Sequence, residues 1–186
     1  MYLLVGLGNV GKEYEMTRHN FGFLLLDKII EGHNFNFAFK KFKSEVFTGQ
    51  INQKKIIAIK PQTFMNRSGR AVMEVANFYK IELKNIIVLH DEVDLEFGKI
   101  RVKLGGGSAG HNGLKSIDEM LGKDYLRVRL GVGKSKIPQI DVADHVLGRF
   151  EKEEILLVEE INKKISSLFS LLLEGRADEF VNKFYL

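Results

Sequence analysis

The chain has 186 residues, of which 45% are hydrophobic, 28% are charged and only two are proline. This length and composition predict one folded domain spanning 1–186 and exclude a disordered, collagen-like or multidomain protein. There is no cysteine, which excludes a disulfide framework, a thiolate metal site and a cysteine nucleophile.

The net charge of +4 is unevenly distributed along the chain. The segment 151–186 holds eight acidic and five basic residues, so residues 1–150 carry 23 bases against 16 acids. A basic body favours a polyanionic partner such as nucleic acid, although an excess of this size also occurs in proteins that bind none.

Short apolar runs alternate with segments of helical period, which is the pattern of an α/β fold. The first strand is expected at Tyr2–Val5, followed by a helix with Phe21, Leu25 and Ile29 on one face that ends at Gly32. The further elements, in chain order, are a hairpin of Glu45–Ile51 and Lys55–Ile59 around Asn52-Gln53, a helix after Ser68, strands at Ile86–Leu89 and Ile100–Leu104, a helix from near Asn112, a strand at Leu126–Val132, and one long amphipathic helix from Ile155 to Leu172. We therefore expect a single α/β domain with a mixed, mostly parallel twisted sheet and helices on both faces.

No segment has the character of a targeting or membrane-spanning sequence. Met1–Val5 lacks a basic leader, and the longest apolar stretch, Ile165–Leu173, contains three serines and is far shorter than the roughly 20 residues that span a bilayer. We expect a soluble, cytoplasmic protein with no membrane association.

Three motifs suggest chemistry that their contexts do not support. Gly6–Gly11 has the spacing of a dinucleotide fingerprint, but the acidic residue at the required distance, Asp27, falls inside the first helix. Gly106-Gly107-Ser108-Ala109-Gly110 has the spacing of a nucleophile elbow with His145 as a distant base, but its glycines favour a longer, pliable loop. Lys134-Ser135-Lys136 lacks the spacing of a phosphate-binding loop and is expected to be an exposed basic turn.

His19 is the best candidate for a general base among five histidines. It stands where the first loop turns into the first helix, and a helix N-terminus disfavours a positive charge, which would help to keep the imidazole neutral. The alternative is that His19 merely caps the helix.

Carboxylates gather after the strand Ile86–Leu89, in His90-Asp91-Glu92-Val93-Asp94. Open α/β sheets bind ligands at the carboxyl ends of their strands, and a carboxylate there can orient a histidine. On a continuing strand His90 and Glu92 would face away from Asp91, and no distant pair completes a ligand set, so we expect no metal.

Two further segments combine amides with possible binding surface. Lys60–Asn66 places Phe64 and Met65 beside Asn66, which suits substrate handling, although Asn66 or Ser68 could instead cap the next helix. Asn112, which follows His111, is ambiguous in the same way because asparagine is a natural helix cap.

Taken together, these segments resemble bacterial-type peptidyl-tRNA hydrolases over essentially the whole chain. The resemblance rests on Gly6–Gly11 with Tyr14, Thr17–Asn20, Lys60–Asn66, His90–Glu92 and Gly105–Gly113, with further support from Arg127–Gly133 and His145–Gly148. One departure is Val10, where the family usually has proline.

The resemblance implies a cytoplasmic, monomeric enzyme of translation and ribosome rescue that needs no cofactor. It would hydrolyse the ester between a peptide and the 3′ ribose of tRNA through a water activated by His19, with Asp91 orienting His19 and no covalent intermediate. The implied substrate contacts are Asn9, Tyr14, Met65, Asn66, His111 and Asn112, and Lys103 and Arg129 are implied as a clamp on tRNA phosphate. An RNA-binding protein on the same scaffold without catalysis is the alternative.

Overall fold

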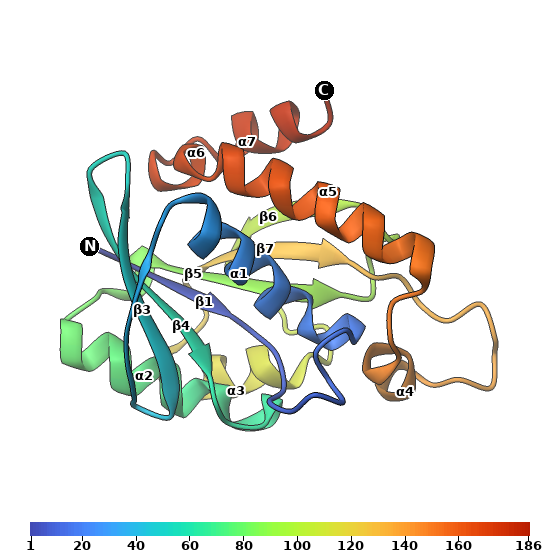
Figure 1. Ribbon diagram of the computed structural model, residues 1–186. Coiled ribbons are helices and arrows are strands. Elements are labelled where there is room, and N and C mark those ends of the chain that lie inside the picture. Colours follow the sequence, from blue (N-terminus) through green and yellow to red (C-terminus); the bar gives the residue numbers. More distant parts are fainter.

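A seven-stranded sheet runs through the computed structural model, which describes all residues from 1 to 186 (Figure 1). The strands are β1 (Tyr2–Gly6), β2 (Asn36–Lys41), β3 (Ser44–Ile51), β4 (Lys54–Pro61), β5 (Ile86–Glu92), β6 (Ile100–Leu104) and β7 (Leu126–Gly131). Their order is β2-β3-β4-β1-β5-β7-β6. The four central strands are parallel, whereas β2, β3 and β6 pair antiparallel with their neighbours. The expected mixed α/β sheet is confirmed.

Helices cover both faces of the sheet, as expected. They are α1 (Phe21–Gly32), α2 (Ser68–Tyr79), α3 (Asn112–Leu121), α4 (Val142–Leu147), α5 (Lys152–Leu168), α6 (Ser170–Leu173) and α7 (Ala177–Phe184), with 3₁₀ turns η1 (Arg18–Asn20), η2 (Met65–Arg67) and η3 (Leu83–Asn85). Figure 1 shows α1 and α5 to α7 on one face and α2 and α3 on the other. No helix combines the length and the apolar character needed to cross a membrane.

The alternation of side chains along β1 divides the core into two layers. Leu4 packs into the cluster beneath α1 and α5, whereas Leu3 and Val5 pack into the cluster with α2 and α3. Because both faces are covered, the strand is continuously apolar rather than alternating. This burial explains why the central strands stand out in the sequence.

Two elements differ in extent from the sequence expectation. β5 continues past Leu89 to Glu92 because its pairing with β7 extends to the register of Glu92 with Gly131. The expected helix to Leu172 is interrupted, since α5 ends at Leu168 and the N–H of Phe169 bonds to the carbonyl of Ser166, a tighter turn than that of an α-helix. The hairpin of β3 and β4 is confirmed, with Asn52 and Gln53 at positive φ in its turn.

Helix α1 packs unusually close to the ends of β1 and β5 at Gly22. A Cβ atom at this position would lie 2.2 Å from the carbonyl oxygen of Leu89 and 2.7 Å from the backbone N and O of Leu7. Only a residue without a side chain permits this approach. The close packing holds η1, which directly precedes α1, against the end of β5.

Candidate active site

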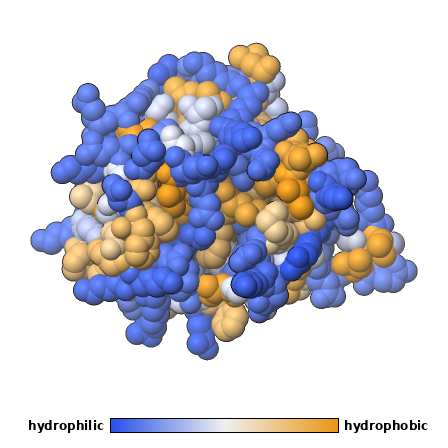
Figure 2. Space-filling model, in the orientation of Figure 1, coloured by the Kyte–Doolittle hydropathy of each residue, from blue (hydrophilic) through white to orange (hydrophobic).

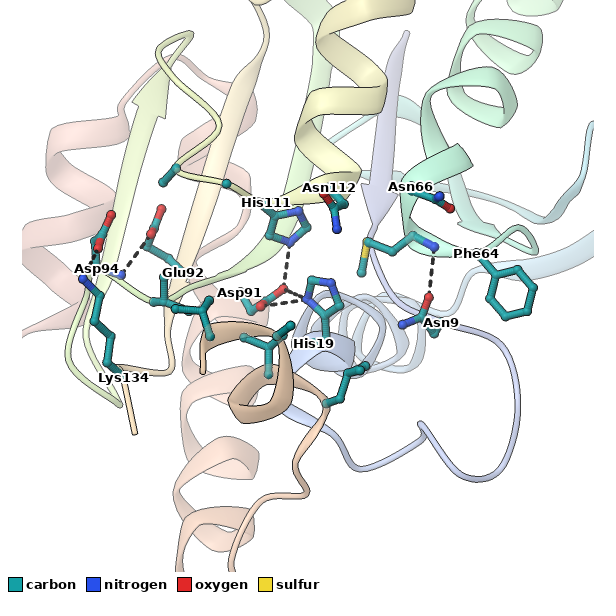
Figure 3. A pocket seen from close by; sticks show the side chains of 18 residues that line it. Asn9, His19, Phe64, Asn66, Asp91, Glu92, Asp94, His111, Asn112 and Lys134 are labelled. Atoms are coloured by element: carbon teal, nitrogen blue, oxygen red, sulfur yellow. Dashed lines mark hydrogen bonds and ion pairs between the residues drawn. The ribbon is translucent and has the colours of Figure 1, made fainter. Parts of the chain in front are cut away.

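A cleft of about 580 Å³ opens at the carboxyl ends of the central strands (Figure 3). The segments that follow β1 and β4, the end of β5, the start of α3 and helix α4 all contribute to its walls. Of the residues expected at the site, the cleft brings together Asn9, His19, Met65, Asn66, Asp91, His111 and Asn112. Tyr14, Lys103 and Arg129 are not among its lining residues.

His19 and Asp91 form a buried hydrogen-bonded pair. The Nδ1 atom of His19 lies 3.0 Å from Oδ1 and 2.9 Å from Oδ2 of Asp91. Because an ionised carboxylate only accepts hydrogen bonds, His19 donates through Nδ1–H, and in the neutral ring its Nε2 carries the free lone pair. The side chain of His19 does not cap a helix, so the capping alternative is wrong.

His19 and Asp91 each shift the pKa of the other toward the charged form. Burial opposes ionisation of His19, but the attraction of Asp91 and its hydrogen bond outweigh this effect and raise the pKa of His19 above its usual 6.5. Burial would also raise the pKa of Asp91, yet the nearby His19 and His111 hold that pKa well below its ordinary value. The net shift of the pKa therefore favours the protonated imidazole, opposite to the neutral form that the helix N-terminus was expected to help to maintain.

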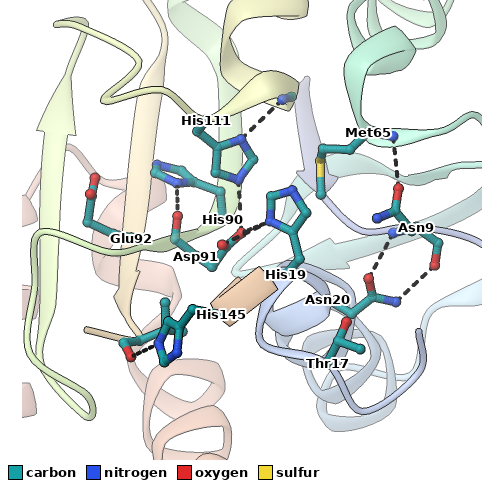
Figure 4. A network of polar contacts seen from close by, with 12 residues as sticks. Asn9, Thr17, His19, Asn20, Met65, His90, Asp91, Glu92, His111 and His145 are labelled. Carbon is teal, nitrogen blue, oxygen red and sulfur yellow. Dashed lines mark hydrogen bonds and ion pairs between the residues drawn. The ribbon is translucent and has the colours of Figure 1, made fainter. Parts of the chain in front are cut away.

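His111 is the second histidine bound to Asp91. Its Nε2 lies 2.8 Å from Oδ1 of Asp91, and its Nδ1 accepts from the backbone N–H of Gly113 and Leu114 (Figure 4). His111 is therefore the N-cap of α3. The alternative in which Asn112 caps this helix is wrong, since Asn112 is its first residue.

His90 lies behind these two histidines and is fully buried. Its Nδ1–H donates to the carbonyl of Asp91, and its Nε2 has no partner. Burial, together with the nearby His111, lowers the pKa of His90 to about 3. His90 is therefore a neutral structural neighbour of the pair rather than a candidate base.

Asn9 is held by a network of three hydrogen bonds. Its backbone N–H donates to Oδ1 of Asn20 at 2.8 Å, and Nδ2 of Asn20 donates to the carbonyl of Asn9 at 2.9 Å. The Oδ1 of Asn9 accepts from the backbone N–H of Met65 at 2.9 Å. This arrangement leaves the Nδ2 of Asn9 as an unbonded donor at the cleft (Figure 4).

Asn66 and Asn112 line the cleft from opposite segments. Both are exposed, and neither side chain makes a hydrogen bond within the protein. Asn66 does not cap α2, and the hydroxyl of Ser68 donates to the carbonyl of Met65 instead. Both amides are thus available to a bound molecule.

The apolar part of the cleft was only partly expected. Met65 is buried, whereas its neighbour Phe64 is 62% exposed and stands at the cleft wall. Another part of the wall comes from α4, which the sequence did not reveal, through Val142, Ala143, Val146 and Leu147. Figure 2 shows a further apolar group on the segment that projects before α4, where Ile137 and Ile140 are exposed.

Lys103 and Arg129 project from the same face of β6 and β7. Arg101 is directly opposite Arg129 in the ladder, and Lys103 is opposite Arg127, so all four side chains share one face. Arg129 is bound to Glu92 through contacts of 3.0 Å, and Glu92 lines the cleft. Lys103 is exposed, so it is the freer cation of the two.

Tyr14 lies in the loop between β1 and η1 and is half-buried. Its backbone carbonyl accepts from the hydroxyl of Thr17, and its side chain is not at the cleft wall. The structure therefore does not bring Tyr14 together with His19 and the asparagines.

The competing glycine motifs do not form sites. No helix follows Gly6–Gly11 directly, and Asp27 in α1 binds Lys60. His145 is not paired with Ser108, since its Nε2–H donates to the carbonyl of Val132. The dinucleotide and serine-hydrolase alternatives are therefore wrong.

His19, Asp91 and His111 have ligand atoms within 4.8 Å of one another, a spacing that could suit a metal ion. A metal on Nε2 of neutral His111 would require a proton on Nδ1. That proton would face the N–H groups of Gly113 and Leu114, which already donate to Nδ1. The donor set therefore does not fit a metal ion.

The fold and the cleft together define an α/β protein with a buried histidine–carboxylate pair beside amide donors, a site suited to acyl hydrolysis. The profile of the peptidyl-tRNA hydrolase family matches residues 3–185. The chain is 48% identical over 184 residues to peptidyl-tRNA hydrolase of Rickettsia bellii, covering 98% of this chain and 99% of that one. It is 46% identical over 183 residues to that of Bartonella henselae, with coverage of 98% and 94%.

A solved structure agrees with these relatives. The crystal structure of peptidyl-tRNA hydrolase from Acinetobacter baumannii superimposes with a TM-score of 0.91 at 35% identity, covering 99% of this chain and 94% of that one. The chain therefore belongs to the peptidyl-tRNA hydrolase family, and the resemblance based on its motifs is confirmed.

Proposed function

We propose that this protein hydrolyses the ester between a peptide and the 3′ ribose of peptidyl-tRNA, by a water molecule activated at His19. Membership of the family supports the substrate. The observation that carries the chemistry is the pairing of His19 Nδ1–H with Asp91, which presents the Nε2 lone pair as a base.

In this mechanism Nε2 of His19 removes a proton from water as the water oxygen attacks the carbonyl carbon of the ester. The resulting imidazolium is stabilised by Asp91. The imidazolium of His19 then returns the proton to the 3′ oxygen of the ribose as the bond between the acyl carbon and that oxygen breaks. The products are a free peptide carboxylic acid and a tRNA with a free 3′ hydroxyl, and no covalent intermediate forms.

The three asparagines supply donors for the substrate and for the developing charge. Asn9 is the best placed of them for the oxyanion because its backbone and Oδ1 are already fixed, leaving only Nδ2 to donate. A donor fixed before the reaction stabilises a transition state better than one that must reorganise. Asn66 and Asn112 are exposed at the rim of the cleft, where they bind the substrate on either side of the ester bond.

The wider role is part of the same proposal. Residues 1–186 act as one domain and as a monomer in the cytoplasm, in translation and ribosome rescue, without a metal or organic cofactor. Lys103 and Arg129 contact phosphates of the acceptor end, Tyr14 contacts the 3′ terminus, and Met65 contacts the substrate beside Asn66. Such phosphate contacts are independent of sequence, as action on many tRNAs requires.

The test is the release of an N-blocked amino acid from tRNA by purified protein. Wild type should turn over, and His19→Ala should lose roughly 10² to 10⁴-fold in kcat, the share that a general base contributes. His33→Ala, at the far end of α1, and Ser108→Ala are controls that should retain activity.

Two other results would each contradict one part of the proposal, the enzymatic activity or the role of His19. Binding of tRNA by wild type without turnover would identify an RNA-binding protein instead of an enzyme. Full activity of His19→Ala would remove His19 from the mechanism while leaving the substrate assignment intact.

A further inference from the structure

Both ring nitrogens of His111 are occupied by groups of the protein itself. Nε2 lies 2.8 Å from Oδ1 of Asp91, and Nδ1 lies 3.1 Å from the backbone N of Gly113 and 3.3 Å from that of Leu114. The side chain of His111 is only 7% exposed. Figure 4 shows its ring bridging the start of α3 and the carboxylate that holds His19.

These contacts define one tautomer of His111. The two amide groups at the start of α3 can only donate, so Nδ1 must be the acceptor. The proton of the neutral ring therefore sits on Nε2, where it faces the carboxylate of Asp91. The helix cap and the bond to Asp91 thus depend on the same protonation state.

The same contacts argue against a polar role for His111 toward the substrate. The family resemblance implies that His111 lines the substrate groove, and its ring does line the cleft. With Nδ1 and Nε2 both engaged, however, the ring has no free nitrogen to offer to a bound ester or ribose.

We propose that His111 is a positioning residue of the reaction, which holds the carboxylate of Asp91 in place and draws part of its negative charge away from His19. This inference rests on the proposed function, since it assigns a role around the same base. In this role His111 connects the first turn of α3 to His19 through Asp91.

The direction of the effect follows from the shared oxygen. Oδ1 of Asp91 accepts from His111 at 2.8 Å and from His19 at 3.0 Å. A donor on the carboxylate weakens its attraction for a proton on His19. Loss of the His111 donor should therefore raise the pKa of His19 further and leave less of the neutral base at a given pH.

The other ionisable groups around these three residues are already paired or neutral. Glu92 on β5 is bound by Arg129, and Asp94 after β5 is bound by Lys134. On the remaining sides, His90 is buried and neutral, Arg127 is paired with Asp118, and His145 of α4 donates to a backbone carbonyl. The shared carboxylate of Asp91 is therefore the main electrostatic link between the two histidines.

Substitutions that keep the cap but remove the donor separate the two roles of His111. Asparagine and serine are strong N-cap residues, and neither reaches as far as Nε2 of histidine. His111→Asn and His111→Ser should therefore fold, with midpoints of thermal unfolding within about 4 °C of wild type. His33→Asn is the matched control, since His33 also lies at a helix end and donates to the carbonyl of Ser166.

We expect both variants to lower kcat near neutral pH by about tenfold, a fraction of what the base itself supplies, with KM changed by less than about twofold. The acidic limb of kcat/KM should move to higher pH by about half a unit. Titration of His19 by nuclear magnetic resonance should show the same upward shift without any substrate, and His33→Asn should match wild type in every measurement.

Two outcomes would overturn the inference. A rise in KM with an unchanged pH profile would make His111 a substrate contact, and wild-type kinetics with an unshifted His19 titration would make it a helix cap only. Because the titration needs no turnover, it decides the role of His111 even if the wild-type protein fails to hydrolyse peptidyl-tRNA, a result that would refute the proposed function alone.

Discussion

The two sides of the cleft are built in opposite ways. On one side His19, Asp91 and Asn9 are buried, and each is bonded to another part of the chain. On the other side α4 presents Val142 and Leu147, which are 49% and 44% exposed, whereas Val146 of the same helix is buried. The segment before α4 has no regular structure from 132 to 141.

This difference corresponds to the two tasks of the proposed reaction. Proton transfer and oxyanion stabilisation need atoms fixed within a few tenths of an ångström, which buried hydrogen bonds supply. A peptide of variable sequence needs a surface that accepts many side chains, which an exposed apolar wall supplies. Substitutions on the two sides should therefore change different kinetic constants.

The largest effect is expected for Asp91→Asn. An amide has one acceptor and one donor, and His111 must keep donating because its Nδ1 is engaged by α3. The amide oxygen should therefore turn to His111 and the amide N–H to Nδ1 of His19, which places the proton of His19 on Nε2. With the base in the wrong tautomer, kcat should fall by about 10² to 10⁴-fold. A loss below tenfold in single-turnover kinetics would contradict this orienting role.

A smaller loss should follow removal of the fixed amide. Asn9→Ala removes the Nδ2 donor and should lower kcat by about 10²-fold. Asn20→Ala leaves that donor in place but frees the backbone of Asn9. Its kcat should therefore lie between those of wild type and Asn9→Ala. If Asn20→Ala matched wild type in kcat, the supporting network would not matter for the reaction.

The pH dependence of wild-type activity tests the protonation state of His19, on the buried and hydrogen-bonded side of the cleft. Only neutral His19 can accept a proton, and Asp91 raises the pKa of His19 above 6.5. The kcat/KM value should therefore fall as pH decreases through a midpoint above 6.5, reaching about a tenfold loss per pH unit well below it. Asp91→Asn removes the carboxylate, so its residual activity should have an acidic limb at lower pH. A wild-type limb near pH 5 would contradict the assignment.

The apolar side should affect binding instead. Leu147→Ser should raise KM about fivefold for substrates with a large apolar residue in the peptide, with little change in kcat. Leu156→Ser is the matched control, since Leu156 is 66% exposed on α5 and does not line the cleft. Equal effects of the two substitutions would show that α4 is not part of the peptide surface.

The smallest effect is expected outside the cleft, at Lys103. Lys103→Gln should weaken tRNA binding about threefold in low salt and reduce the slope of log affinity against log salt by about one, as for one lost phosphate contact. Lys103 is the cleaner test because substitution of Arg129 would leave Glu92 unpaired. Lys163→Gln on α5 should behave as wild type, and an unchanged slope for Lys103→Gln would argue against the clamp.

The central strands could be predicted because burial on both faces leaves an uninterrupted apolar run, as in β1 and β5. The edge strand β2 was not predicted because nearly all of it is exposed and no face of it alternates clearly with burial. Helices α4 and α7 were missed because each is short. In α7 only Phe180 and Phe184 are buried, which is too little for a recognisable period.

The residues of the cleft and the pairing of Asp91 with His19 could be predicted from motifs, but the remaining bonds and their electrostatic effect could not. Asp91 is 72 residues from His19 in sequence, so its effect on the pKa of His19 is visible only when the fold brings them together. Asn20 stands in the same motif as His19, yet its bonds to Asn9 depend on how the first loop folds back. The same holds for His111, whose second bond runs to the start of its own helix.

The spacing of His19 and Asp91 depends on a residue that has no side chain. Gly22 lets the first turn of α1 touch the backbone of Leu89, which precedes Asp91 by two residues in β5. A single methyl group at position 22 would act as a wedge between helix and strand, and His19 would move away from Asp91 although every reacting atom was unchanged. The position of the proposed base is therefore sensitive to a change of one carbon atom in the packed interface between helix and strand.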